Sequence, residues 1–427
     1  MTLAGLALRS LRNRLLATAL AVLSIAVSVA LLVGVEQVRT GVRESFTGTI
    51  RGVDLIVGPR GGQTELLLSS VFGIGAPTAN VAAATLARWS AHPAVKWVIP
   101  WSLGDSHRGF RVIGTSEAFY EHWRFRDDRR VTVTEGAPPA ALYDVAIGSE
   151  VAATLGYRVG TPIVVAHGLR EGFARHEATP FTVTGVLAAT GTPIDRSLFV
   201  TLEGMEAMHA DWAEAAPGTP PAIGSAPGPA PATSPPRRRE DVAVDEVSAF
   251  FLGTKNRIET LRLQREINTD TGEPLTAIVP GVALAELWRT IGYAENGLRL
   301  VSLFVVAVGL IGMLAAIYTS LDARRREMTI LRAIGAHPWQ VAALLVLESG
   351  LLGLVGCLLG VGLTYASVAA LQPAVERAFG IHLAARPPSA TELGYLAAVI
   401  GAALAIGLVP AWRAYRNSLA DGLTIRI

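Results

Sequence analysis

Four long apolar stretches constrain this chain more than any other feature of its sequence. They are residues 15–35, 300–321, 341–371 and 393–412, and the only charged residue within them is Glu348. Each has the length, about 20 residues, that a helix needs to cross a hydrocarbon core about 30 Å thick. With 51% hydrophobic and 17% charged residues, the chain is too apolar for an ordinary soluble protein of 427 residues. We therefore predict an α-helical membrane protein with four transmembrane helices.

The first stretch also has the basic flank of a secretory signal peptide. Its apolar run exceeds the length of a signal-peptide core, and the following GVEQVRTGVRESF has no persuasive cleavage site. We interpret it as a retained membrane anchor.

Clusters of arginine predict the orientation of the spans, since basic residues stay on the cytosolic side of a membrane. The clusters are Arg9, Arg12 and Arg14 before the first span, Arg324, Arg325 and Arg326 after the second, and Arg413 and Arg416 after the fourth. Both termini are therefore expected in the cytosol. The predicted topology is 1–14, 322–340 and 413–427 inside, with 36–299 and 372–392 outside.

The segment between the first two spans mixes short β-type runs with helix-like pieces. Runs rich in Val, Ile and Phe, such as VDLIVG and FTVTGVL, are bounded by Gly, Pro or Asp and predict strands. Helices are expected at 81–90, 150–155, 203–209 and 257–267. The mixture predicts a large α+β extracytoplasmic domain inserted between transmembrane helices 1 and 2.

Three finer expectations concern this domain. Helical stalks should continue the first span to Phe46 and lead back to the second over 282–299. In the helix at 257–267, Ile258, Leu261 and Leu263 should face a core. Residues 217–236 are dominated by Pro, Ala and Gly without periodicity, and we expect a disordered insertion there.

The sequence lacks the motifs of several classes of enzyme and binding protein. Neither lysine, Lys96 or Lys255, stands in a Walker A loop, and no Gly-x-Ser-x-Gly or His-Glu-x-x-His occurs. The single cysteine, Cys357, excludes an intrachain disulfide. A net charge of +2 gives no bulk attraction for nucleic acid. We expect no catalytic residue and no cofactor in this chain.

The histidines of the outer segment do not have the spacing of a metal site. With the glutamates near two of them they are His107, His122, His167, His176, His209, Glu171 and Glu177. None of them forms the helical or paired spacing of a zinc motif, so no metal site is expected.

The segment 322–340 (DARRREMTILRAIGAHPWQ) carries the densest group of charges beside a span. A helix over its first part would place apolar side chains on one face, with arginines free to meet a partner's acidic groups or lipid headgroups. The alternative is that the three arginines only set the topology.

The sequence around this segment resembles that of the FtsX-like permeases, the membrane subunits of MacB-type ABC transporters. The run RRREMTILRAIGAHPWQVAALLVLESGLLGLVGCLLG is similar to the family's signature segment. ALRSLRNRLLATALAVLSIAVSVALLV and GLVPAWRAYRNSLADGL resemble its first span and closing segment, and YDVAIGSEVAATLGYRVGTPIVV and FTVTGVLAATGTPIDRSLFVTLEGM resemble its extracytoplasmic core domain. The proline-rich 217–236 departs from the family pattern.

The resemblance implies a homodimer or a pair of related permeases in the inner membrane of a bacterium. It also implies a separate ABC ATPase that carries ATP and Mg, and mechanotransmission from that ATPase to the outer domain. A periplasmic adaptor or substrate-binding protein and membrane lipids are further implied partners. The residues implied to couple to the ATPase are Arg324, Arg325, Arg326, Glu327, Met328, Leu331, Arg332, Ile334, Gly335, Ala336 and His337.

Two further features have both a structural and a functional interpretation. Glu348 is costly in a membrane unless it is paired, protonated or near water; it either packs near the cytosolic interface or contacts an arginine of the terminal helix or the 322–340 segment. The apolar segment 63–81 is either a buried packing element or a surface for a lipidic substrate or partner. Its candidate surface residues are Leu66, Leu67, Leu68, Val71, Phe72 and Ile74.

Three functions follow from these observations. The leading one is a transporter permease that exports or releases a substrate when the ATPase works. The second is a transmembrane scaffold, like FtsX, that regulates a periplasmic enzyme and transports nothing. The third is a membrane receptor, although the sequence has no cytosolic signalling domain.

Overall fold

The computed structural model describes residues 15–167, 180–215, 238–333, 335–379 and 386–417. The chain divides into two compact units. One unit, the helical bundle, comprises residues 1–42, 292–375 and 383–427, and the other, the α+β domain, comprises 43–291 and 376–382. The proline-rich 217–236 lies outside the described residues.

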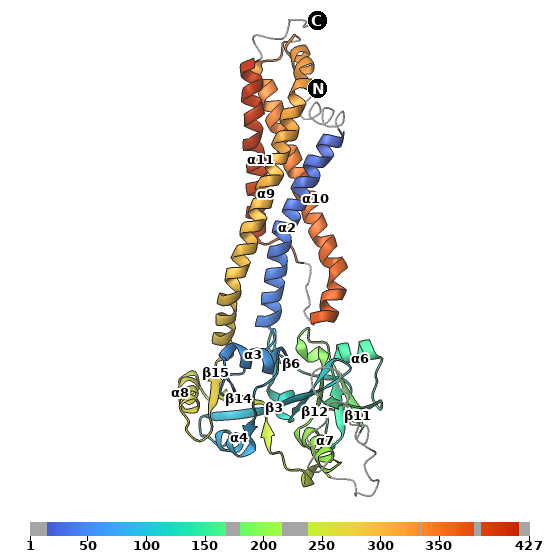
Figure 1. The fold of residues 1–427 in the computed structure, drawn as a ribbon, viewed down its shortest axis with the longest axis vertical. Helices are drawn as coiled ribbons and strands as arrows, with labels where there is room; N and C mark the ends of the chain where they lie inside the picture. The colour runs from blue at the N-terminus through green and yellow to red at the C-terminus, as the bar shows by residue number, and fades with distance from the viewer. Residues whose placement is uncertain (1–14, 168–179, 216–237, 334, 380–385, 418–427) are drawn as a thin grey trace. The chain divides into compact units, whose positions relative to one another are not determined.

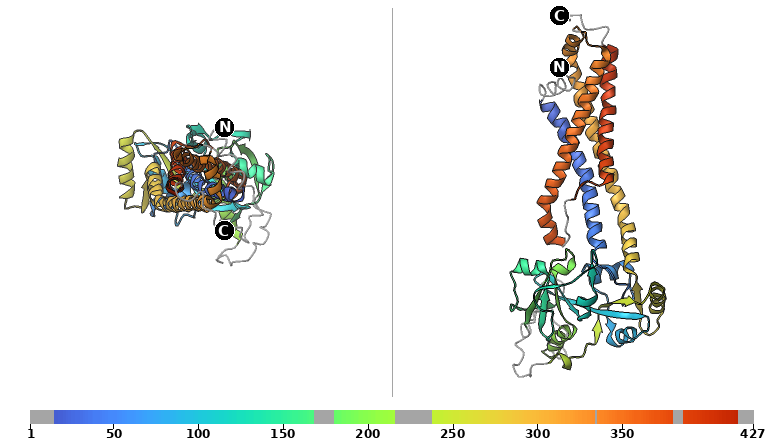
Figure 2. Two further views of the ribbon diagram at one scale, coloured as in Figure 1. Left: turned by 90° about the horizontal axis from the view of Figure 1, so that it is seen from above. Right: turned by 180° about the vertical axis from the view of Figure 1, so that it is seen from behind.

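The bundle is formed by four helices that run side by side in Figures 1 and 2. They are α2 (Leu15–Thr47), α9 (Pro280–Ala333), α10 (Pro338–Phe379) and α11 (Ala390–Asn417). Each contains a stretch apolar and long enough to cross a membrane, Thr18–Glu44, Pro280–Thr319, Pro338–Val375 and Ala390–Trp412. The predicted four transmembrane helices are confirmed.

Apolar side chains cover both the inside and the outside of the bundle. Ile25 of α2, Met313 of α9 and Ala403 of α11 are among those that pack in its core. Leu23 of α2 and Phe304 of α9 are 57% and 64% exposed. An exposed apolar face of this kind suits a helix that faces lipid.

Small residues bring the bundle helices close together. An added Cβ at Gly356 of α10 would lie 2.6 Å from Ile25, and one at Gly360 would lie 2.7 Å from the Ala26 carbonyl oxygen. Beside this contact the Thr364 hydroxyl donates to the Ala30 carbonyl, 3.2 Å away, and so joins α10 to α2. Helices in lipid pack through such close backbone approach, because lipid offers them no hydrophobic drive to associate.

The α+β domain is built on one mixed sheet of eleven strands. Its order is β15-β1-β14-β3-β4-β12-β8-β11-β7, with β10 beside β3 and β9 beside β11. The bounds are β1 (Leu55–Pro59), β3 (Val95–His107), β4 (Phe110–Thr115), β7 (Val133–Gly136), β8 (Asp144–Ile147), β9 (Pro162–Ile163), β10 (Ala166–His167), β11 (Phe181–Leu187), β12 (Ser197–Thr201), β14 (Ala249–Thr254) and β15 (Leu275–Ile278). Strand pairs β4–β12 and β8–β11 are parallel and the others antiparallel.

Helices and short strands complete the domain. The helices are α3 (Gln63–Val71), α4 (Ala83–Ser90), α5 (Ala118–His122), α6 (Ser149–Leu155), α7 (Leu202–Ala215) and α8 (Arg257–Asn268), with 3-10 turns η1 (Pro193–Arg196) and η2 (Arg239–Asp241). Two-stranded sheets pair β2 (Val81–Ala82) with β13 (Glu246–Val247), and β5 (Arg124–Phe125) with β6 (Arg129–Arg130). The predicted α+β class is confirmed.

Alternation along the strands gives the large sheet two buried faces. In β12, Leu198 and Val200 join one core while Phe199 joins the other. The second core, which we call the aromatic core, is covered by α3 and α5 and holds Trp101, Phe119, Trp123, Phe199 and Phe251. Residues of α4, α6, α7 and α8 pack against the opposite face. Because both faces of the sheet are covered, the strands are nearly continuous runs of apolar residues in the sequence.

The expected core-facing residues of α8 are partly wrong. Ile258 and Leu261 are 82% and 64% exposed, whereas Leu263 is buried as expected. The buried stripe runs through Thr260, Leu263 and Ile267, at helical spacing. Thr260 belongs to the core because its hydroxyl is satisfied there, 3.1 Å from the Asn256 carbonyl oxygen.

The close contact between α10 and α2 gives a test of the bundle. Replacing Gly360 by Ala would force apart α10 and α2 and lower the free energy of unfolding by about 1–3 kcal/mol. Gly362→Ala is the matched control, since no atom lies within 4 Å of the added Cβ. Thermal unfolding in detergent micelles measures both, and equal stability of the two variants would contradict the packing described here.

Candidate functional site

One helix carries both the second stalk and the first part of the predicted coupling segment. Helix α9 is unbroken over 54 residues from Pro280 to Ala333, which corresponds to about 80 Å at 1.5 Å per residue. Among the coupling residues, the structure describes the backbone but not the side chains of Arg324, Arg325, Arg326, Glu327, Met328, Leu331 and Arg332. Ile334 lies outside the described residues.

A tight turn joins α9 to α10. Gly335 has φ +101°, a backbone conformation that residues with a side chain rarely adopt. The His337 amide donates to Oε1 of Gln340 at 2.8 Å, and Pro338 is the first residue of α10. These are the contacts of a helix start, in which the third residue caps the amide that precedes the helix. The described part of the segment 322–340 forms a helical hairpin, in which α9 ends at Ala333 and α10 begins at Pro338.

The hairpin exposes apolar side chains where it turns. Ile330 of α9 is 53% exposed and Trp339 of α10 is 60% exposed. We refer to residues 324–340 as the coupling hairpin. Exposed tryptophans are typical of protein interfaces.

Four charged residues tie α2 to α9 within the bundle. Glu36 pairs with Arg39 at 2.6 Å and with Arg299 at 3.1 Å, and Arg39 also meets Glu295 at 3.4 Å. Glu36 is only 4% exposed. We call these residues the stalk ion-pair cluster. It was not predicted, although Glu36–Arg39 and Glu295–Arg299 have the spacing of neighbours on a helix.

A second set of polar contacts anchors the start of α11. The Ser389 amide donates to Glu392 at 2.6 Å and the Glu392 amide donates to the Ser389 hydroxyl at 3.2 Å, which is a capping box. The Tyr365 hydroxyl of α10 donates to the Arg386 carbonyl at 2.6 Å. The beginning of α11 is therefore fastened to α10.

Aromatic side chains hold the ends of both stalk helices inside the α+β domain. Phe46 of α2 stacks on Phe72, with ring centroids 4.2 Å apart, and meets Trp288 of α9 edge-on at 5.7 Å. Leu284 and Leu287 of α9 are buried in the aromatic core. We call Phe46, Phe72 and Trp288 the stalk-base triad. Through it, both stalk ends contact the segment that follows α3.

Two family models match the sequence and together cover most of the chain. The model of the MacB-like periplasmic core domain matches residues 18–222, and that of the FtsX-like permease C-terminal region matches residues 299–419. The chain belongs to the FtsX-like permease family. It is thus a membrane protein of a permease family of ABC-type transporters, as the resemblance of its sequence predicted.

Two solved structures are similar to part of this permease. The periplasmic region of MacB from Actinobacillus actinomycetemcomitans is 10% identical, with 56% of the permease and 94% of that chain covered and a TM-score of 0.33. The extracellular domain of the noncanonic ABC-type transporter YknZ from Gram-positive bacteria is 13% identical, with coverages of 53% and 98% and a TM-score of 0.29. At such scores these likenesses carry no structural argument, and the assignment rests on the family models. No curated protein matches the sequence.

Glu348 of the permease lies in the interior of the bundle. It is 3% exposed, and its neighbour Ser349 is fully buried. The residue is engaged in an interaction and is not an isolated charge.

The apolar segment of the permease packs mainly inside the α+β domain. Leu66, Leu67, Val71 and Phe72 are buried, Leu68 is half-buried, and Ile74 is 52% exposed. These residues therefore do not form one exposed surface. The apolar side of α3 covers the aromatic core because the sheet presents Trp101 and Phe251 beneath it.

The described histidines of the permease have structural contacts. His107 is buried between the Val164 carbonyl at 2.6 Å and the Tyr157 hydroxyl at 3.0 Å. His122 stacks on Trp97, with centroids 5.0 Å apart, and burial lowers its pKa. No group of three or more His, Cys, Asp or Glu side chains gathers among the described residues. The side chains of His167, Glu171, His176, Glu177 and His209 are not described.

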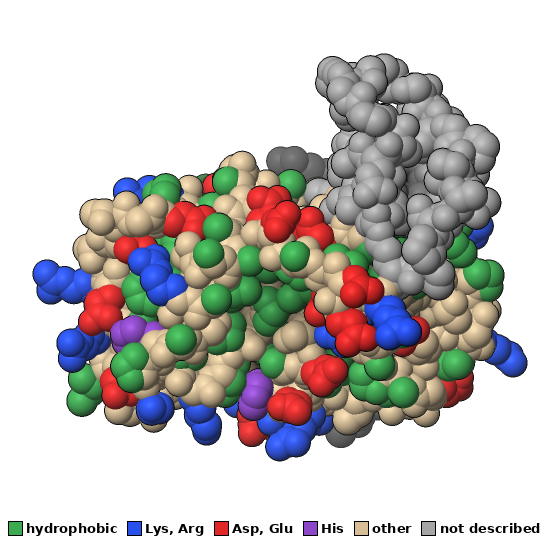
Figure 3. All heavy atoms as spheres, turned by 90° about the horizontal axis from the view of Figure 1, so that it is seen from below, with side chains coloured by type: hydrophobic (Ala, Val, Ile, Leu, Met, Phe, Trp, Pro, Cys, Tyr) green, Lys and Arg blue, Asp and Glu red, His purple; other side chains and the backbone are tan. Residues whose placement is uncertain are grey.

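Charge on the domain surface is mixed. On the face in Figure 3, acidic and basic side chains alternate with apolar ones over the described residues. Such a surface has no extended field of one sign to attract a polyanion.

The stalk ion-pair cluster generates a prediction for stability. Glu36→Gln would leave Arg39 and Arg299 without the buried carboxylate between them. We expect a loss of about 1–3 kcal/mol in the free energy of unfolding, less than for a fully buried pair because both arginines reach solvent. Glu286→Gln, at an exposed position of the same α9, is the control. Thermal unfolding of both variants in detergent checks this, and a Glu36→Gln protein as stable as the control would show the cluster to be dispensable.

Proposed function

We propose that this permease transmits work from a separate ABC ATPase to its α+β domain, and so drives export or release of a substrate. The observation that carries the proposal is the continuity of α9 from Pro280 to Ala333. One end of this helix belongs to the coupling hairpin, and the other has its side chains in the aromatic core.

A helix of this kind can act as a rod. Helix α9 has no proline in its interior, and sharp kinks in helices arise mostly at proline or at local breaks in the hydrogen-bond ladder. A displacement of the coupling hairpin would therefore be carried along α9. The stalk ion-pair cluster holds α2 to α9, which favours movement of both stalks together.

At the end of α9 that begins with Pro280, a small number of contacts would transmit the displacement to the α+β domain. Leu284, Leu287 and Trp288 are packed against the aromatic core, and Trp288 meets Phe46 of α2. Interiors are close-packed and transmit strain rather than absorb it. Movement of these residues would reshape the segment after α3.

The chemistry of ATP hydrolysis would belong to the partner chain. The permease sequence has no Walker A loop, so ATP and Mg would be held by the ATPase. The arginine clusters support a cytosolic hairpin and cytosolic termini in the inner membrane of a bacterium. The family supports a dimer of permeases, and an adaptor or substrate-binding protein would act outside the membrane.

The scaffold function of FtsX differs from transport in what stimulates the ATPase. A transporter predicts stimulation by its substrate and an adaptor partner. A scaffold predicts a bound extracytoplasmic hydrolase and no stimulation by substrate. Purification of the permease with its partners from native membranes separates the two.

Charge reversal in the coupling hairpin tests the docking of the ATPase. We expect Arg325→Glu with Arg326→Glu to reduce ATPase recovery with the tagged full chain by about tenfold or more, since like charges in an interface cost several kcal/mol. The same reversal at Arg257 and Arg265, both exposed on α8, is the matched control. A hairpin variant that recovers as much active ATPase as the control would rule out docking through these arginines.

Accessibility labelling tests the proposed orientation. In a Cys357→Ser background, which removes the lone cysteine, we would introduce Ile258→Cys or Arg325→Cys singly. A membrane-impermeant maleimide should label position 258 in intact spheroplasts and position 325 only after permeabilisation. The reverse pattern would invert the topology and place the hairpin out of reach of a cytosolic ATPase.

A further inference from the structure

A cavity of about 280 Å³ lies in the α+β domain beside the aromatic core. This is close to the lower end of small-molecule sites, about 300 Å³. Its apolar walls are formed by Phe46, Phe72, Trp101, Ile113, Trp123 and Ile194. Hydroxyl groups of Thr49, Ser69, Ser70 and Ser197 also line it, and its charged residues are Arg111 and Arg196.

Arg111 enters the cavity because of its place in β4. Its neighbours Phe110 and Val112 pack on one face of the sheet, whereas Ile113 packs in the aromatic core. Alternation along a strand places Arg111 on the same face as Ile113. The alternation along β4 therefore predicts an apolar side chain at position 111, and the sequence has an arginine there.

The charge of Arg111 has no counter-ion in the part of the chain that the structure describes. Its Nη2 donates to the Gly75 carbonyl at 2.6 Å, but its Nη1 is buried without a hydrogen-bond partner. Burial lowers the pKa of the guanidinium, which nonetheless stays charged at neutral pH. Arg196, at the same cavity, is paired with Glu150 at 2.7 Å. Arg111 is thus the cation at this cavity that has no counter-ion among the described residues.

The loop after α3 is shaped around Arg111. Gly73 has φ +65°, and a Cβ there would lie 3.0 Å from both Cδ and Nε of Arg111. The absence of a side chain at 73 lets the guanidinium stem lie against the backbone. The indole nitrogens of Trp101 and Trp123 are buried donors without a hydrogen-bond partner among the described residues.

We propose that this cavity binds an amphiphilic anion, with its apolar part against the aromatic walls and its phosphate or carboxylate group on Arg111. A planar guanidinium without a counter-ion suits an oxyanion. A neutral apolar ligand would leave the buried charge uncompensated. An inorganic anion would leave the aromatic walls in contact with water.

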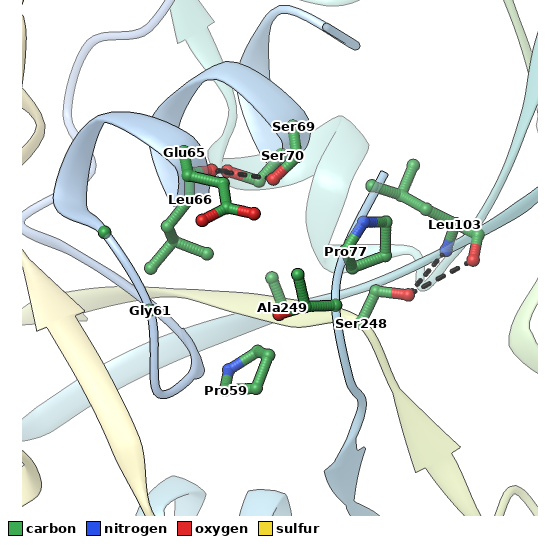
Figure 4. Close-up of a pocket in the computed structure, with 12 residues that line it drawn as sticks. Pro59, Gly61, Glu65, Leu66, Ser69, Ser70, Pro77, Leu103, Ser248 and Ala249 are labelled. Atoms are coloured by element: carbon green, nitrogen blue, oxygen red, sulfur yellow. Dashed lines mark hydrogen bonds between the residues drawn. The ribbon is translucent and has the colours of Figure 1, made fainter. Parts of the chain in front are cut away.

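A neighbouring smaller cavity does not compete for this role. It shares Ser69, Ser70 and Leu103 with the larger one and has a volume of about 20 Å³, enough for a single water. Figure 4 shows the Ser248 hydroxyl linked to Leu103 beside it, and Ser70 bonded back to Leu66 of its own helix. The hydroxyls of Ser69, Ser70 and Ser248 are hydrogen-bonded within the domain. Binding of an amphiphilic anion in the larger cavity goes beyond the proposed transport function and does not depend on the partner ATPase.

Calorimetric titration of the full chain in phosphatidylcholine nanodiscs tests the proposal. The probes are octyl phosphate, octanol and inorganic phosphate. We expect saturable binding of octyl phosphate only, and about tenfold or greater weakening in Arg111→Met, since hydrogen bonds to a charged group are the stronger kind. Partitioning into the bilayer is the same for both proteins, so their difference reports the site. Arg262→Met, which removes an exposed arginine of α8, is the control.

Other results of these titrations would overturn the proposal or identify the source of the ligand. Equal binding of octanol, or of inorganic phosphate, would overturn the proposal, as would unchanged affinity in Arg111→Met. If that variant fails to fold, Arg111→Lys and Gly73→Ala serve instead, and unchanged affinity in both would overturn it equally. Nanodiscs that contain phosphatidylglycerol separate the sources of the ligand: competition with octyl phosphate indicates a bilayer lipid, and no competition indicates a soluble amphiphile.

Discussion

The hydrocarbon core of a membrane offers no hydrogen-bond partner to a polypeptide backbone, and this constraint determines the rest of the structure. Each span has to satisfy its own amides and carbonyls as a helix. In α2 and α9 the helical conformation continues beyond the apolar stretch, to Thr47 at one end and back to Pro280 at the other. The stalks are thus extensions of spans.

The bundle and the α+β domain use different means to achieve close packing. The bundle relies on Gly356 and Gly360, where backbones approach because side chains are absent. The domain relies on large rings, and Trp101 alone contacts four other aromatic residues. The stalk-base triad belongs to the second kind of packing. The helices therefore end in a region with well-defined side-chain geometry, which suits the transfer of a displacement.

Features that depend on composition over many residues could be predicted from the sequence. The four spans, the α+β class and most strands follow from apolar runs and their boundaries. Features that depend on which elements meet could not. Ile258 and Leu261 look like core residues, but the hydroxyl of Thr260 finds partners in the domain and sets a different buried stripe. The meeting of Glu36 with Arg299, and of Arg111 with the Gly73 loop, involves residues far apart in the chain.

The uninterrupted course of α9 also restricts how its length can vary in evolution. A single residue inserted between Gly292 and Ser302 would turn everything beyond it by about 100° and advance it by about 1.5 Å. The helical phase of residues 324–333 relative to Leu284 and Leu287 would then change. Only insertions close to whole turns, such as seven residues, would preserve the phase. We therefore expect functional homologues to keep this spacing even where the residues themselves differ.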